Sequence, residues 1–298
     1  MSSLPIPATI RGGARVREFL GLFKLRIGVF IMLTAVVGYI VTPGPGLAPG
    51  AVIVLALSVL LASASAGAFN QYAEADSDRL MARTRNRPFA TGALARTPAW
   101  LWLIGGMLAV AVGAAWWTTN AMAALYVFLG AFFYGVVYTL WLKRRTSLNI
   151  VIGGLAGSFA ALAGAAAVDP GVGMHGWLLA LALFLWTPPH FWSLAIAGQA
   201  DYAAAGVPML PVVVGSERAA RIVHLSVVAL VLASLLPMLF GAGWVYLAGA
   251  LLGGLYFERK ARALAAAPSR ATAIRSFLAS LVQLGLLLAA ASIDGAMR

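Results

Sequence analysis

Six long stretches of this sequence contain no charged residue, and they constrain the fold more than any other feature. They cover residues 27–73, 97–142, 146–168, 170–200, 222–257 and 276–293. A helix needs about 20 mostly apolar residues to cross about 30 Å of hydrocarbon, so each stretch predicts at least one membrane span. Charged residues make up only 10% of the 298 residues, whereas a soluble domain carries about 25%. The chain is therefore predicted to be an all-α polytopic membrane protein.

Three of these stretches are long enough for two helices, and each has helix-breaking residues near its middle. The breaking segments are 42–50, with three prolines and three glycines, 118–120, and 237–243. Proline and glycine in such clusters mark turns between helices. The sequence thus predicts nine spans in a single bundle around a central cavity, as one domain over residues 1–298 with a cytoplasmic N-terminal segment at 1–25.

Lysine and arginine test this topology because they concentrate in cytoplasmic loops. With nine spans, 20 of the 21 lysines and arginines lie on one face, and the exception is Arg298. Treating 222–257 as one span would move five of them to the other face. The N-terminus is therefore predicted to be cytoplasmic, in a bacterial inner membrane. Residues 1–26, with several arginines and one acid, Glu18, leave a mitochondrial presequence as an alternative.

The charge and cysteine content limits the partners of the chain. A net charge of +12 suits anionic lipid headgroups or anionic substrates. The basic residues are dispersed between apolar stretches, which argues against nucleic acid as a partner. The sequence has no cysteine, so disulfides and thiolate metal sites are excluded.

An acidic cluster stands out at the cytoplasmic end of the predicted second span. Asn70, Glu74 and Asp78 are spaced four residues apart, so on a helix they form one oxygen-bearing stripe from which Asp76 points away. Repulsion between carboxylates at this spacing is relieved by a cation, and hard oxygen ligands suit Mg²⁺. The arginine-rich run that follows, residues 79–87, suits phosphate oxygens. The sequence predicts a metal-diphosphate site here.

Pro188 and Pro189 remove two backbone donors inside the sixth predicted span. They are expected to kink or unwind it, exposing His190 to a cavity. On an unbroken helix, His190 and Asp201 would lie within about 20° of one face and about 16 Å apart.

Four segments together resemble a known family. They are Asn70-x-x-x-Glu74-x-x-x-Asp78, the run from Met81 to Pro88, the run from Tyr138 to Gly154, and the run from Trp186 through Asp201 and Tyr202 to Val213. They resemble the intramembrane aromatic prenyltransferase superfamily, and within it the branch that farnesylates protoheme IX. The resemblance covers about residues 24–215. Position 74 is Glu where the superfamily has Asp, and a second acidic motif is reduced to Asp201, which puts a second metal in doubt.

The resemblance implies transfer of a farnesyl group from farnesyl diphosphate to the 2-vinyl group of protoheme IX, giving heme O for terminal oxidases. It implies Mg²⁺ as the cofactor, held by Asn70, Glu74 and Asp78, with Asp201 as a further catalytic acid. Further partners would be the lipid bilayer and heme A synthase or oxidase assembly proteins. The implied substrate-binding residues are Arg83, Arg87, Lys143 and Arg144 at the diphosphate, Tyr138 and Tyr202 beside it or the allylic cation, and His190 at the heme.

Two alternatives stay open at this point. The acceptor could be a quinone precursor or a chlorophyll-type tetrapyrrole, although the single Asp201 and the Pro188-Pro189-His190 segment argue against a quinone. The chain could instead be a transporter. Transporters place polar or broken segments near the midplane in both halves of a repeat, whereas every acid here lies at or near the end of a predicted span.

Overall fold

The computed structural model describes residues 19–297, and in this part of the chain it contains helices and no strand. The long helices are α2 (Leu25–Val41), α3 (Pro49–Ala73), α6 (Pro98–Thr118), α7 (Ala121–Phe132), its π-helical continuation η1 (Phe133–Leu142), α9 (Leu155–Val168), α10 (Gly173–Ala197), α13 (Ser216–Ala233), α14 (Trp244–Ala266) and α15 (Arg270–Ala296). Short helices join them: α4 (Ala75–Asp78), α5 (Pro88–Thr91), α8 (Asn149–Gly153), α11 (Gln199–Ala204), α12 (Leu210–Val214) and the 3₁₀-helix η2 (Leu236–Phe240). The predicted segment 1–25 lies mostly outside the described residues, and so does Arg298.

Seven helical segments of the described chain are long and apolar enough to cross a membrane. The predicted turns fall where the breaking residues stand, at 42–48, 119–120 and between η2 and α14. Two of the nine predicted spans do not reach the same standard. α2 is apolar but has only 17 residues, and the last part of α14 carries Glu258, Arg259, Lys260 and Arg262. The protein is thus a multi-span helical membrane protein.

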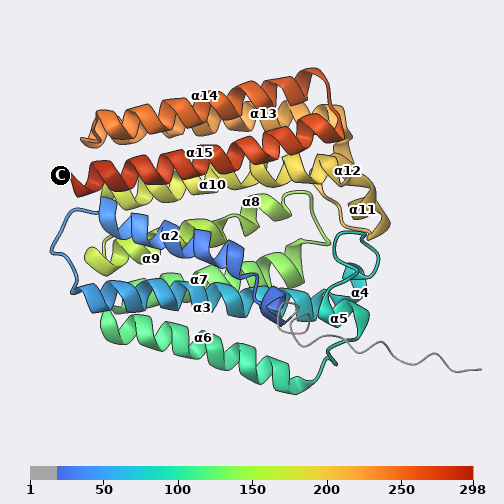
Figure 1. Ribbon diagram of the computed structural model, residues 1–298, viewed down its shortest axis with the longest axis horizontal. Coiled ribbons are helices and arrows are strands. Elements are labelled where there is room, and N and C mark those ends of the chain that lie inside the picture. Colours follow the sequence, from blue (N-terminus) through green and yellow to red (C-terminus); the bar gives the residue numbers. More distant parts are fainter. Residues whose placement is uncertain (1–18, 298) are drawn as a thin grey trace, which may run out of the picture.

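The helices lie roughly antiparallel in layers, from α6 at one edge to α13 and α14 at the other (Figure 1). The long helices form a closed ring of contacts. Each one packs on the next long helix along the chain, and the last, α15, packs on the first, α2. α4, α5, α11 and α12 gather at one end of the bundle, and the chain finishes at the opposite end (Figure 1). We call the first of these the loop end.

Small residues allow α2 and α9 to cross in close contact at the centre of the bundle. A Cβ atom on Gly38 would overlap the carbonyl oxygen of Ala161, and one on Gly164 would overlap that of Ala35. Close backbone approach of this kind is the usual basis of helix association in lipid.

Exposed tryptophans mark both ends of the bundle. Trp102 near the start of α6 and Trp141 at the end of η1 lie toward the loop end. Trp117 at the end of α6 and Trp244 at the start of α14 lie toward the opposite end, and their exposed fractions are 92% and 80%. Tryptophan favours the two interfaces of a bilayer, so these residues indicate how the bundle sits in the membrane.

Candidate functional site

The three oxygen-bearing residues predicted as a stripe lie together at the loop end, although the helix that carries them is interrupted. α3 ends at Ala73, Glu74 has non-helical backbone angles, and α4 begins at Ala75. The amides of Glu74 and Asp78 nevertheless donate to the carbonyls four residues earlier, at 3.0 and 2.8 Å. Asn70, Glu74 and Asp78 therefore keep helical register, and all three are buried. Asp76 is exposed and pairs with Arg96 at 3.0 Å, in agreement with its predicted orientation.

Each of the three residues contacts a basic side chain from a different segment. Lys143 lies 2.5 Å from a Glu74 carboxylate oxygen, and Arg87 lies 2.7 Å from Oδ2 of Asp78. Nζ of Lys24 donates to Oδ1 of Asn70 at 2.6 Å. Both carboxylates are thus paired within the protein, and Lys24 adds a third basic side chain beside the neutral amide of Asn70. Two of these partners, Arg87 and Lys143, are residues predicted to bind diphosphate.

The π-helix η1 brings Lys143 to this cluster. Tyr134 and Lys143 are nine residues apart, so an α-helix, at about 100° per residue, would place them on opposite faces. The wider turns of η1 place both beside the cluster: Tyr134 accepts a hydrogen bond from Lys24 at 2.9 Å, and Lys143 pairs with Glu74. π-helical turns occur frequently at functional sites, and this one places Lys143 beside Glu74.

Lys24 was not identified as a site residue from the sequence. It precedes α2 in a left-handed conformation with φ of 49°, which a residue with a side chain adopts only at a cost. Its ammonium lies between Asn70 and Tyr134. Burial, and to a lesser extent Arg87, lowers the pKa of Lys24 to about 7. Thr139 is a second such residue, because it accepts a hydrogen bond from Asn70 at 3.0 Å.

The remaining predicted residues lie around this cluster at varying depth. Tyr138 and Tyr202 are buried in one apolar group with Met81. Burial raises the pKa of Tyr202, and nearby Arg83, which donates a hydrogen bond to the phenol oxygen, partly opposes the shift. Asp201 is half-buried and forms no ion pair with a described residue. Arg83 and Arg144 are exposed.

His190 and Asp201 do not share an unbroken helix, because α10 ends at Ala197 and Gly198 separates it from α11. The amides of Gly198 and Tyr202 still donate to the carbonyls four residues earlier, at 3.1 and 3.2 Å. The expected unwinding at Pro188 and Pro189 is absent, since α10 is helical through both. His190 faces α15, where Nδ1 lies 2.6 Å from the hydroxyl of Ser280.

The cluster has a group suited to a cation. Oδ1 of Asp78 is fully buried and has no hydrogen-bond partner among the described residues. A buried carboxylate oxygen left unpaired is costly, and a bound cation would satisfy it. No group of three or more His, Cys, Asp or Glu in the described chain could hold a metal by itself, so a metal here would also need the Asn70 amide oxygen or oxygens from a ligand. Carboxylate, amide and phosphate oxygens suit Mg²⁺.

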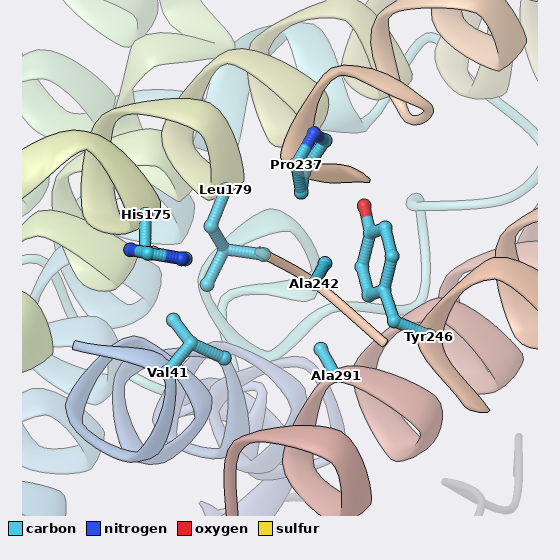
Figure 2. A pocket seen from close by; sticks show the side chains of 7 residues that line it. All are labelled: Val41, His175, Leu179, Pro237, Ala242, Tyr246 and Ala291. Carbon is cyan, nitrogen blue, oxygen red and sulfur yellow. The ribbon is translucent and has the colours of Figure 1, made fainter. Parts of the chain in front are cut away.

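A small cavity lies at the opposite end of the bundle (Figure 2). Its volume is about 20 Å³, and His175 and Tyr246 stand on opposite sides of it (Figure 2). A space of this size holds roughly one water molecule. The charged cluster at the loop end is therefore the better candidate for a substrate site.

The apolar helical bundle with paired charges at one end is that of an intramembrane prenyltransferase. The chain belongs to the UbiA prenyltransferase family, whose model matches residues 31–282. It is 55% identical over 283 residues to Protoheme IX farnesyltransferase 2 of Paramagnetospirillum magneticum. The aligned region covers 94% of this chain and 98% of that protein.

Two solved structures share the fold. A structure of digeranylgeranylglyceryl phosphate synthase matches with a TM-score of 0.77 and 18% identity, over 96% of this chain and 100% of that one. A UbiA homolog from Archaeoglobus fulgidus, bound to DMAPP and Mg²⁺, matches with a TM-score of 0.69 and 18% identity, over 91% of this chain and 99% of that one.

Proposed function

We propose that the protein transfers a farnesyl group from farnesyl diphosphate to the 2-vinyl group of protoheme IX, giving heme O. The observation that carries the proposal is the buried cluster of Asn70, Glu74 and Asp78, in which each residue faces a basic side chain. The 55% identity to a protein named for this activity supports the choice of substrates.

Within this proposal, Asn70, Glu74 and Asp78 hold Mg²⁺, and Asp201 provides a further carboxylate. When bound, the metal supplies positive charge that stabilises the departing diphosphate. Arg87 and Lys143 stand beside these carboxylates, where they can exchange to phosphate oxygens. Arg83 and Arg144, both exposed, reach the same diphosphate from the loops.

The bond between farnesyl C1 and oxygen breaks, and its electron pair leaves with the diphosphate. The resulting allylic cation adds to the terminal vinyl carbon, and water adds to the neighbouring carbon with loss of a proton. The tyrosine rings of Tyr138 and Tyr202 face the cation, because ring faces attract positive charge. His190 contributes to binding the heme.

The proposal includes a topology. α2 and α14 would complete nine spans around a central cavity, in one domain of a bacterial inner membrane with the N-terminus in the cytoplasm. The basic residues support this orientation, since nine spans place 20 of 21 on one face. Heme A synthase or oxidase assembly proteins would receive the product.

The decisive experiment is incubation of the purified protein with heme, farnesyl diphosphate and Mg²⁺, followed by mass spectrometry of the pigment. We expect hydroxyethylfarnesyl heme, and none when Mg²⁺ is chelated. Prenylation of a 4-hydroxybenzoate-type acceptor in place of heme would contradict the proposal.

A further inference from the structure

The imidazole of His190 is fixed on three sides. The ring of Trp186 stacks on one face with centroids 4.1 Å apart, and the ring of Phe277 lies over the other at 4.6 Å. Nδ1 lies 2.6 Å from the Ser280 hydroxyl. Trp186 also donates its indole N–H to the Ser280 carbonyl at 2.9 Å. These contacts join α10 to α15 and leave the ring little freedom to rotate.

The hydrogen atoms around Ser280 determine which nitrogen of His190 carries the proton. The hydroxyl has one hydrogen, and both the Phe277 carbonyl and Nδ1 lie 2.6 Å from its oxygen. Both contacts are hydrogen bonds only when the hydroxyl donates to the carbonyl and accepts from Nδ1–H. With Nδ1 unprotonated, the single hydrogen would be needed at Nδ1, and the buried contact with the Phe277 carbonyl would lose its hydrogen bond, which is costly. The neutral ring thus carries its hydrogen on Nδ1 and a lone pair on Nε2.

Nε2 is the ring nitrogen left available. It has no hydrogen-bond partner among the described residues, and it is not among the fully buried unpaired atoms. Histidine binds metals through a neutral nitrogen, and a hydrogen bond at the other nitrogen sets which one is free.

We infer that Ser280 is a positioning residue that holds His190 in the Nδ1–H tautomer, so that Nε2 presents its lone pair to the iron of the heme acceptor. The identity of the acceptor rests on the proposed function. The role of Ser280 in fixing the tautomer rests on the geometry alone. Nothing in the sequence around Ser280 indicated this role, because residue 280 is 90 positions from His190.

The chain offers a matched control. Ser276 lies one turn before Ser280 on the same helix, is fully buried, and forms a hydrogen bond of 2.9 Å with Ser193 on α10. Ser276→Ala therefore removes the same kind of contact between the same helices without touching His190. Ser280→Thr keeps the hydroxyl and serves as the rescue variant.

The first test measures the tautomer by ¹⁵N NMR of the full-length protein in detergent, labelled at histidine. The protein has three histidines, and His190→Gln assigns the signal of interest. We expect Nδ1 of His190 to be protonated in the wild type, Ser276→Ala and Ser280→Thr, and the tautomers to mix in Ser280→Ala. Protonation of Nε2 in the wild type, or no change in Ser280→Ala, would overturn the inference.

The second test is a Soret titration with heme on the same variants. Loss of a group that orients a metal-binding histidine typically costs about 10- to 100-fold in affinity, so Ser280→Ala is expected to weaken heme binding by about tenfold and Ser276→Ala to leave it unchanged. Equal effects of both would assign Ser280 to packing. Product analysis of the wild type tests the proposed function separately, so heme farnesylation with an unperturbed tautomer in Ser280→Ala would remove only the role of Ser280.

Discussion

Each buried carboxylate of the site has a single cation partner on another element. Glu74 is held by Lys143 and Asp78 by Arg87, and the side-chain exposures of the two acids are 5% and 1%. Removing one partner of a buried pair leaves an uncompensated charge, which costs about 3–5 kcal/mol. Substitutions here act on stability as well as on chemistry, so the two effects must be measured separately.

Asp78→Asn should reduce turnover by about 100-fold or more, the scale expected on losing one preorganised electrostatic group. The oxygen without a partner belongs to this carboxylate, and the change removes its charge at nearly constant volume. Asp76→Asn is the control, because Asp76 is exposed and pairs with Arg96. Both variants are assayed for Mg²⁺-dependent turnover after confirming insertion. Equal losses would show that the buried stripe is not the site.

Lys143→Met should destabilise the protein by about 3–5 kcal/mol, because Glu74 loses its partner. The double variant Glu74→Gln/Lys143→Met should recover most of that stability and stay inactive. Thermal unfolding in detergent, read as a double-mutant cycle, measures the coupling. Simply additive losses would mean that the pair contributes no coupling energy.

The sequence was informative where the chemistry is local. Four-residue spacing was enough to predict that Asn70, Glu74 and Asp78 share a face, because backbone geometry alone determines it. The partners could not be predicted in the same way. Lys24 lies 46 residues from Asn70 and 110 from Tyr134, and only the packing of whole helices brings such residues together. The break between α10 and α11 at Gly198 was not predicted, because no proline marks it.

At the scale of elements, η1 positions the site. Its i to i+5 hydrogen bonds depend on tertiary contacts, so helical periodicity does not reveal it. Gly153 contributes, since a Cβ atom there would lie 2.8 Å from the ring of Tyr138. The helix after a π-segment is rotated relative to the one before, and the loop carrying Lys143 takes its direction from that rotation.

Deletion of Val136 should convert η1 toward an α-helix, in which Tyr134 and Lys143, then eight residues apart, would point about 80° apart and no longer to the same cluster. We expect turnover to fall to background while the protein still inserts. Val136→Ala is the control, because it keeps the length of the segment and the side chain of Val136 is exposed. Turnover and membrane insertion are measured for both. An active Val136 deletion would show that the π-helix is dispensable.

The close contact between α2 and α9 predicts that a larger residue at the crossing lowers stability. Gly164→Ala places a methyl group on the Ala35 carbonyl, and overpacking of this kind costs about 1–3 kcal/mol. Gly157→Ala on the same helix meets nothing within 4 Å and should be neutral or slightly stabilising. The test is to measure the melting temperatures of both variants in detergent. Equal melting temperatures would mean that α2 and α9 can move apart to make room for the methyl group at no cost in stability.

At the scale of the whole molecule, the proposed orientation rests on where the charges lie. Reporter fusions near Arg85 and Arg262 should both report the cytoplasm, because the loops around them carry the basic residues. A fusion after residue 297 should report the opposite side. A periplasmic signal near Arg262 would reduce the number of spans to eight.

The tryptophans at the two ends of α6 set the depth at which this protein works. Trp102 and Trp117 are 15 residues apart, or about 22 Å along the helix. This is less than a hydrocarbon layer of about 30 Å, so both rings lie near its borders, toward its inside. The charged cluster then lies at the interface between the hydrocarbon layer and water. A prenyl diphosphate already rests there with its head in one phase and its chain in the other. This substrate is therefore supplied by lateral diffusion in the membrane. The rate of supply should depend on the mole fraction of the substrate in the lipid, not on its concentration in the aqueous phase.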